Sequence, residues 1–474
     1  MQDRCRQLIL LTSPLLLWAA CVCYPVVDDW TYLTVPNFDG FMKADYLLPR
    51  GNQWRPFDAI FGYLLALRPT LFPWMNHVVI VVGHVVNTLL VYSIGQQLGF
   101  KSLARYISTL VFYLSPAMVA TVLNTDSINQ VYSQLWGLTG LLICLRMHGR
   151  RKYVLWGITL LLATLSKENG IMWAWVTPLV VAGVRNERGA MKNGFLWGTV
   201  VAFLYLTVRF AWSTEVIRTD SAYVNDGLLQ HVRGLMMLIG YTFIPLDYVS
   251  IVHAPSRNGW LIAITLLLSI PFLIIFVRCL LKSSSRIGWV LMASILLLAL
   301  PHLLTIFSVL HAYAALSLSA LLIGYVIQQE TRHRWLIGSF IAYAAAMLIS
   351  TGHHWQKSMK SGETGKQLVK GVLRQSKHPA RNVFLIMQED KSPQYSSFCV
   401  NPADAFGWGR AVCMETHYQW PESITELVVP VDQWNEKKDS FIFDALSTGY
   451  DAVWIQKHHT ITVLEKESSH STLP

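Results

Sequence analysis

An uncharged apolar stretch covers Trp74–Leu98 and reads WMNHVVIVVGHVVNTLLVYSIGQQL. It is longer than the roughly 20 apolar residues that a helix needs to cross a bilayer. Two more long apolar blocks follow, at Trp260–Leu281 and Ile287–Phe307. Over all 474 residues, 53% are hydrophobic and 14% are charged, whereas a soluble domain carries roughly 25% charged residues. We therefore predict an α-helical polytopic membrane protein.

The basic residues stand mainly between the apolar blocks, so the net charge of +10 points to membrane topology rather than to nucleic-acid binding. The basic clusters all fall on one side of the membrane if the chain crosses it about 11 times. The positive-inside rule makes that side cytoplasmic. We expect Leu8–Tyr24 to be an uncleaved first span, with a cytoplasmic N-terminus, and Leu228–Val249 to lie in the interface. The C-terminus is then extracytoplasmic.

Two domains are expected. Residues 1–351 form a transmembrane domain that includes an outer loop at 26–72, and residues 352–474 form a small extracytoplasmic α/β tail. In the tail we predict one helix and a set of strands, the last two of which pair across Lys457–His459. Cys399 and Cys413 are predicted to form a disulfide in this oxidising location. The predicted helix is Lys357–Gln375, and the predicted strands are Asn382–Met387, Glu426–Val431, Phe441–Leu446, Asp451–Ile455 and Thr460–Glu465.

An acidic pair, Asp28-Asp29, directly follows the first predicted span. Adjacent carboxylates repel each other unless a cation or a reacting hydroxyl balances them, so one of them can act as a general base. Solvated loop acids at the end of a helix are an equally good explanation from these residues alone.

A second charged pair, Lys167-Glu168, lies between two apolar segments that are too short to span comfortably, Tyr153–Leu165 and Gly170–Val184. The turn is expected within the outer part of the membrane, where charges are costly and usually functional. A lysine there suits a lipid phosphate, and Glu168 can orient this lysine or another cation. The alternative is an ordinary loop exposed by bilayer thinning or by snorkelling side chains.

Other residues are candidates for lining a cavity. Arg50 and Arg55 can bind phosphate or the nearby aspartates, or can pack as surface arginines on Trp54. His84, inside an apolar span, is more often a structural core histidine than a functional one. His311 and Tyr313 lie near the outer end of a predicted span and can line the same cavity.

Several stretches together resemble the membrane half of the protein O-mannosyltransferases and of the tetratricopeptide-repeat O-mannosyltransferases, which belong to the GT-C superfamily of membrane glycosyltransferases. An acidic pair after the first span is the hallmark of that superfamily. The segment His311-Ala312-Tyr313 departs from the family, which tends to carry Glu-Arg-Tyr, and the tail is not a tetratricopeptide array. The matching stretches are Gln53-Trp54-Arg55-Pro56, Gly83-His84 with Asn87–Tyr92, Leu165-Ser166-Lys167-Glu168, Pro245-Leu246-Asp247-Tyr248 and Trp355-Gln356-Lys357-Ser358.

The resemblance implies an enzyme that moves a sugar from a polyprenyl-phosphate donor to an acceptor hydroxyl on the outer membrane face. Asp28 would deprotonate the acceptor, and Asp29 would support it. Lys167, Glu168 and Arg55 would hold the donor phosphate, and Asp247 and Tyr248 would line the cavity. The acceptor can be a glycan, a protein or a lipid, a divalent metal is left open as a cofactor, and a bacterial cytoplasmic membrane is the expected location.

Two other classes of function are retained as alternatives. One is a polysaccharide or lipid transporter, although such proteins commonly show internal repeats and helices broken near the midplane. The other is a non-catalytic membrane scaffold whose tail binds a partner. Activity that survives a change of Asp28 would favour either of them.

Overall fold

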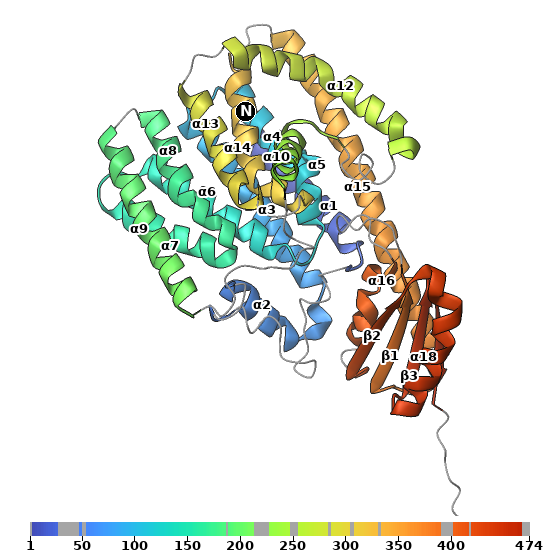
Figure 1. The fold of residues 1–474 in the computed structure, drawn as a ribbon. Helices are drawn as coiled ribbons and strands as arrows, with labels where there is room; N and C mark the ends of the chain where they lie inside the picture. Colours follow the sequence, from blue (N-terminus) through green and yellow to red (C-terminus); the bar gives the residue numbers. More distant parts are fainter. Residues whose placement is uncertain are drawn as a thin grey trace, which may run out of the picture. The chain divides into compact units, whose positions relative to one another are not determined.

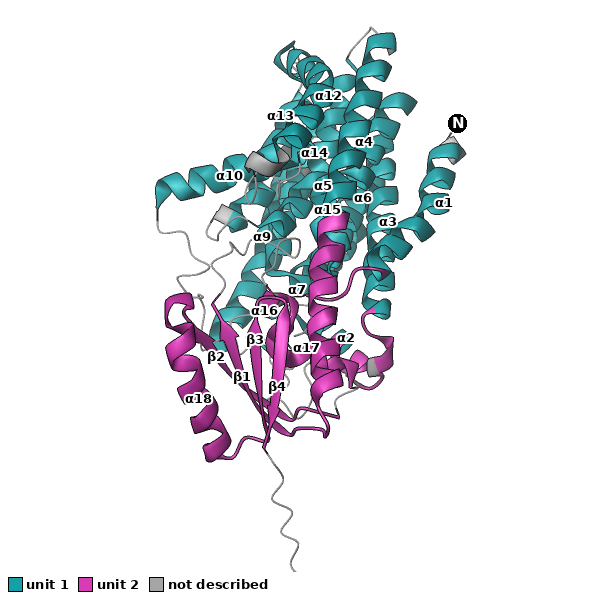
Figure 2. Ribbon diagram, turned by 90° about the vertical axis from the view of Figure 1, so that its right-hand side faces the viewer, with its two compact units in different colours: residues 1–21, 43–61, 74–355 teal, residues 22–42, 62–73, 356–474 magenta. Residues whose placement is uncertain are grey.

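A computed structural model describes residues 2–26, 47–49, 54–185, 188–212, 227–246, 255–282, 286–303, 308–329, 333–389, 402–416 and 419–466. The chain forms two compact units, which Figure 2 colours separately. Unit 1 contains residues 1–21, 43–61 and 74–355, and unit 2 contains residues 22–42, 62–73 and 356–474.

Unit 1 is helical throughout its described part (Figure 1). The longest helix, α15, continues from unit 1 into unit 2. Short 3-10 segments η4, η5 and η6 interrupt the pattern at Glu168–Met172, Leu300–Leu303 and Val309–His311. The α-helices are α1 (Gln2–Cys21), α2 (Pro56–Ala66), α3 (Trp74–Gln97), α4 (Ser102–Leu114), α5 (Pro116–Val122), α6 (Ile128–Arg146), α7 (Arg151–Ser166), α8 (Trp173–Arg185), α9 (Arg188–Trp212), α10 (Leu228–Phe243), α12 (Pro255–Lys282), α13 (Arg286–Ala299), α14 (Ala312–Ile327) and α15 (His333–Gln375).

The core of unit 1 is built around α14, all 16 residues of which are buried. It packs against α4, α5, α10, α12 and α13 (Figure 1). Small residues recur in its sequence, AYAALSLSALLIGYVI, and let neighbouring backbones approach closely. At Gly324, a Cβ would lie 2.7 Å from the Ala104 carbonyl oxygen, so α4 and α14 are in contact through backbone at this point.

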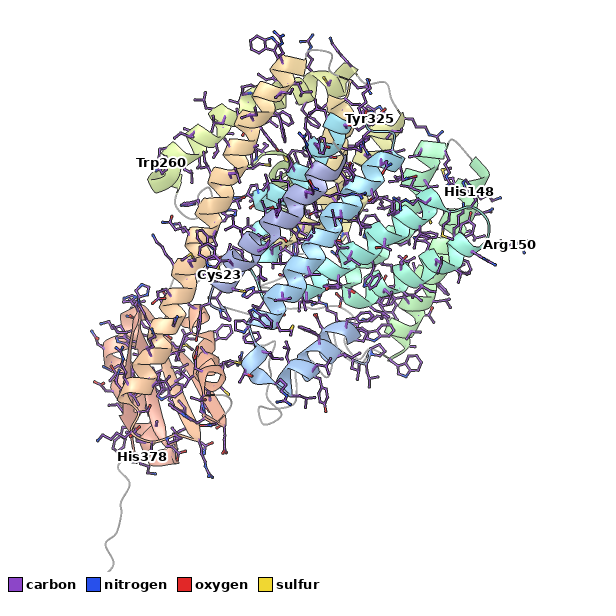
Figure 3. The ribbon with its side chains drawn as sticks, turned by 180° about the vertical axis from the view of Figure 1, so that it is seen from behind. Cys23, His148, Arg150, Trp260, Tyr325 and His378 are labelled. Carbon is purple, nitrogen blue, oxygen red and sulfur yellow. The ribbon has the colours of Figure 1, made fainter. Side chains whose placement is uncertain are left out.

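Five helices in the described residues are long and apolar enough to cross a membrane, or six if the bent pair α4–α5 counts as one span. This indicates a membrane protein. The exposed face of α12 is apolar, as at Leu267 and Leu281, which are 71% and 82% exposed. Figure 3 shows Trp260 at one end of α12. The predicted total of about 11 spans stays a prediction, since α7 and α8 have only 16 and 13 residues.

Unit 2 contains a four-stranded sheet in the order β2-β1-β3-β4. The strands are β1 (Asn382–Gln388), β2 (Ser423–Val429), β3 (Ala452–Lys457) and β4 (Thr460–Glu465). β1 pairs in parallel with both β2 and β3, whereas β3 and β4 form an antiparallel hairpin. The predicted pairing of the last two strands is therefore confirmed, and the tail is an α/β module. Its shorter helical segments are α16 (Pro402–Ala405), η7 (Gly407–Gly409), α17 (Arg410–Glu415) and η8 (Val431–Gln433).

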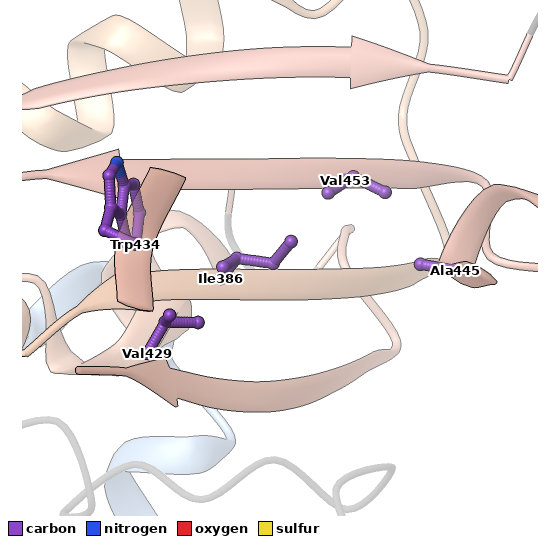
Figure 4. Close-up of a cluster of buried hydrophobic side chains, with 5 residues drawn as sticks. All are labelled: Ile386, Val429, Trp434, Ala445 and Val453. Atoms are coloured by element: carbon purple, nitrogen blue, oxygen red, sulfur yellow. The ribbon is translucent and has the colours of Figure 1, made fainter. Parts of the chain in front are cut away.

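One predicted strand is wrong. The segment Phe441–Leu446 belongs to helix α18, which runs from Trp434 to Thr448 and ends at Gly449 with a φ of 108°. Its apolar residues recur at helical spacing and place one face on the sheet. Figure 4 shows the resulting core of Ile386, Val429, Trp434, Ala445 and Val453 between α18 and the strands.

Candidate functional site

The helix break predicted at Ser166–Asn169 is present. α7 ends at Ser166, Lys167 adopts an extended conformation with φ −155° and ψ 139°, and η4 follows before α8 begins. The turn is closed by a hydrogen bond of 2.8 Å from the Gly170 N–H to the Lys167 carbonyl. Glycine is needed at position 170 because a Cβ would collide with the backbone carbonyl of Ala163. Lys167 and Glu168 are thereby held in place by the backbone of a tight turn.

Glu168 forms a two-pronged ion pair with Arg55. The Arg55 Nε donates to Glu168 Oε2 at 3.0 Å and to Oε1 at 3.2 Å, and Arg55 Nη2 donates to Oε2 at 2.9 Å. The Trp54 backbone N–H adds a bond of 3.3 Å to Oε1. Trp54 in turn stacks on Tyr205 of α9, with ring centroids 5.1 Å apart and planes 9° from parallel. The loop before α2 is thus anchored to the turn after α7.

Lys167 is connected to a carboxylate indirectly, through Asn129 at the start of α6. The Asn129 Nδ2 donates to Asp58 Oδ2 at 2.8 Å and to the Asp126 carbonyl at 3.1 Å. Its Oδ1 accepts a long bond of 3.4 Å from Lys167 Nζ. Asp58 is 1% exposed and Asn129 is 4% exposed. The amide therefore separates the buried Asp58 carboxylate from the half-buried Lys167 ammonium.

We refer to Arg55, Asp58, Asn129, Lys167 and Glu168 as the turn cluster. Burial, reinforced by the positive charge of Arg55, lowers the pKa of Lys167 to about 8, although nearby carboxylates partly oppose this. Burial alone would raise the pKa of Glu168, but the charge and hydrogen bonds of Arg55 outweigh it and bring the pKa below its ordinary value. Glu168 is therefore ionised at neutral pH, and Lys167 can change charge slightly above it.

His311 is connected to the turn after α7 through His302 and Asn169. The Asn169 Nδ2 is 3.2 Å from His302 Nε2, and the His302 ring stacks on His311 with centroids 4.1 Å apart. The Ser308 N–H donates to His311 Nδ1 at 3.4 Å. These contacts connect the turn after α7 to the segment before α14, where His311 was predicted to line a cavity.

Tyr313 and His84 form a separate group. His84 Nδ1 is 3.0 Å from the Tyr313 hydroxyl, to which Asn87 Nδ2 also donates at 3.1 Å. All three side chains are fully buried, and His84 stacks on Phe112 and Tyr113. We call His84, Asn87 and Tyr313 the histidine cluster. His84 Nε2 and Asn87 Oδ1 have no hydrogen-bond partner among the described residues, so the structural role favoured for His84 from the sequence stays a prediction.

Several predicted site residues lie outside the described residues: Asp28, Asp29, Arg50, Asp247 and Tyr248. The same holds for Cys399, whereas Cys413 is buried on α17. The predicted disulfide and the roles of these residues stay predictions. Within the described part of the chain, no group of three or more His, Cys, Asp or Glu residues is placed to hold a metal ion.

The structure adds four residues that the sequence did not single out: Asp58, Asn129, Arg209 and His302. Asp58 stands alone as a charge in the apolar helix α2, three residues after Arg55, and that isolation was a usable signal. Arg209 lies one turn after Tyr205 on α9, is 7% exposed, and its Nη1 has no hydrogen-bond partner in the described structure. Asn129 and His302 gave no sequence signal, because their roles depend on neighbours distant in the chain.

No protein-family model matches this chain, and no curated protein matches it. Two solved structures of the Archaeoglobus fulgidus oligosaccharyltransferase are similar to it. The complex with Zn and sulfate is 12% identical, with a TM-score of 0.42 and coverage of 93% of this chain and 67% of that one. The apo form is 11% identical, with a TM-score of 0.42 and coverage of 93% and 69%. At these values, no reaction and no site residue is carried over to this chain.

Proposed function

We propose that this chain is a membrane glycosyltransferase that moves a sugar from a polyprenyl-phosphate donor to an acceptor hydroxyl on the outer membrane face. The observation that supports this most directly is the environment of Lys167. Its ammonium lies at a helix break, and the one hydrogen bond seen for it among the described residues is the 3.4 Å contact with Asn129. A cation placed at a helix break and so loosely engaged is suited to bind a phosphate.

Arg55 has a different role in this proposal. Its guanidinium is held by two carboxylate oxygens of Glu168, so much of its hydrogen-bonding capacity is engaged within the protein. The ion pair therefore fixes the first outer loop against the turn, and its residual positive charge adds to the field at Lys167. Glu168 is a positioning residue for Arg55 rather than for Lys167.

The reaction requires one proton transfer and one displacement. Asp28 removes the proton of the acceptor hydroxyl, the acceptor oxygen forms a bond to the sugar's anomeric carbon, and the bond between that carbon and the phosphate oxygen breaks. The polyprenyl phosphate leaves with the electron pair of the broken bond. Lys167, supported by Arg55, stabilises the negative charge on the leaving phosphate, and charge stabilisation of this kind is usually the largest catalytic contribution.

Asn129 keeps the ammonium available for this task. A direct Asp58–Lys167 ion pair would neutralise the lysine and compete with the phosphate. The Asn129 amide instead donates to Asp58 and accepts from Lys167. Arg209 is buried, and its Nη1 has no hydrogen-bond partner among the described residues, so it is a further cation that can contribute to the positive field near Tyr205.

The test compares wild type, Asp28→Asn, Lys167→Ala and Lys192→Ala at matched membrane levels. Lys192 is an exposed lysine on α9 and controls for the loss of one positive charge. Envelope glycans and polyprenyl-linked sugars are then profiled by mass spectrometry. We expect one sugar to reach an acceptor with wild type and with Lys192→Ala, and its lipid-linked donor to accumulate with the other two variants.

The opposite result is equally informative. If all four proteins give the same profile, neither Asp28 nor Lys167 takes part in transfer, and the proposal is wrong. Accumulation of a glycan on one side of the membrane, without any new linkage, would instead identify a transporter. A profile unchanged even by deletion of the gene would favour a scaffold.

A further inference from the structure

A groove lined by α12 and α15 of unit 1 has apolar walls and two arginines. It holds about 470 Å³. The α12 wall is formed by Pro271, Ile274, Ile275 and Arg278, and the α15 wall by Arg334, Trp335, Gly338, Ser339 and Ala342.

The two helices meet at one end of this groove. The Phe272 ring packs on Tyr343 with centroids 4.5 Å apart and on Phe340 at 5.5 Å. The groove runs from this contact toward Arg278, six residues further along α12, which corresponds to about 9 Å of helix. The α15 wall has no side chain at Gly338, and a Cβ built there meets no atom within 4 Å, so the groove is open at this position.

The charged end of the groove has a distinct composition. Arg278 and Arg334 are both exposed, and no acidic residue lines the groove. Among the described residues, neither arginine forms one of the observed ion pairs. Trp335, 77% exposed, lies beside Arg334, and tryptophan favours the headgroup level of a bilayer.

We propose that this groove binds one anionic phospholipid. Its phosphate lies between Arg278 and Arg334, and one acyl chain lies along Ile274 and Gly338 toward the Phe272 contact. Guanidinium groups form forked hydrogen bonds with phosphate, and basic pockets between membrane helices bind lipid headgroups. A zwitterionic lipid brings a positive group to the same two arginines and is therefore the poorer ligand. The site is separate from the turn cluster and does not depend on the proposed reaction.

The experiment uses the full chain, purified in micelles, and counts bound phosphatidylglycerol and phosphatidylcholine by native mass spectrometry during titration. Arg278→Gln/Arg334→Gln removes the charges, and Gly338→Leu fills the groove without any change of charge. The matched controls are Arg150→Gln/Arg151→Gln, an exposed basic pair at the start of α7, and Gly352→Leu, at another open position of α15.

We expect wild type and both controls to retain one phosphatidylglycerol about tenfold more tightly than phosphatidylcholine, a difference of about 1.4 kcal/mol. Both test variants lose that tightly bound lipid. Equal binding of the two lipids by wild type overturns the proposal. So does a double arginine variant that binds like its control. A third outcome is that the double arginine variant loses the preference for phosphatidylglycerol whereas Gly338→Leu keeps it. The headgroup then binds to the arginines but the acyl chain does not lie in the groove, and the proposed position of the lipid is wrong.

Discussion

The turn cluster and the histidine cluster are both polar groups inside an apolar helical unit, but they differ in charge and in backbone. The turn cluster contains Arg55, Asp58, Lys167 and Glu168 and lies where α7 breaks. The histidine cluster contains neutral hydrogen-bonding groups on two unbroken helices, α3 and α14. Charges at a helix break are costly to maintain. The histidine cluster carries no ionised acid or lysine, and its His84 Nδ1, Asn87 Nδ2 and Tyr313 hydroxyl are joined by hydrogen bonds, while His84 Nε2 and Asn87 Oδ1 have no partner among the described residues. We therefore propose a chemical role for the first cluster and a structural role for the second.

The largest expected effect is on Lys167. Lys167→Ala should lower the rate of sugar transfer by about 10²- to 10³-fold, the cost typical of removing one charge-stabilising donor. Its thermal unfolding should change little, because the side chain makes one long hydrogen bond. Initial rates with a lipid-linked donor, measured beside the melting temperature, check both points. A rate within threefold of wild type would remove Lys167 from the mechanism.

The next largest effect concerns stability, and it compares the backbone of the turn after α7 with that of helix α3. Gly170→Ala places a Cβ against the Ala163 carbonyl, which cannot move without unwinding the end of α7, and should cost about 1–3 kcal/mol of unfolding free energy. Gly83→Ala, next to His84, meets side-chain atoms of Val131 and Tyr132 rather than backbone. It should cost less. Denaturation of the two variants in the same detergent tests this order, and the reverse order would contradict the rigid-turn interpretation.

The pH dependence of transfer should report on Lys167. Because its pKa lies near 8, the ammonium is present at pH 7 and is lost as the pH rises through 8. Donor binding should therefore weaken about tenfold between pH 7 and pH 9, since the protonated fraction of a group with a pKa of about 8 falls about tenfold over this range. Lys167→Arg stays protonated over this range and should abolish the decline. A decline of the same size in Lys167→Arg would assign the titration to another group.

The smallest effect is expected in the histidine cluster. Tyr313→Phe removes the hydroxyl that His84 and Asn87 share and should cost about 1 kcal/mol of stability. Transfer per folded molecule should stay unchanged. A fall in the specific rate, with an unchanged melting temperature, would show that the histidine cluster takes part in the chemistry after all.

Much of the helical architecture was predictable, since runs such as Trp74–Leu98 leave few alternatives to an apolar helix. The break at Lys167 was also predictable, because two short apolar segments flank a charged pair. The segment Phe441–Leu446 is predicted as a strand and is part of helix α18. A short apolar run fits both the helical and the strand periodicity. Only its packing against the sheet, together with that of Trp434, shows that the segment is helical.

The partners of the site residues were not predictable. The sequence predicts that Glu168 orients Lys167 or another cation, and it does not identify that other cation. The fork to Arg55, the Asn129 bridge to Asp58, and the separation of Tyr313 from the turn arise between segments far apart in the chain.

By itself, the sequence determined the membrane class, the helix break and which residues carry charge, because segment length, hydropathy and charge are local properties of the chain. The tertiary structure decided which charges pair and which ammonium stays loosely held. Those choices depend on distances of a few ångströms between helices, and the periodicity of a single chain does not contain them.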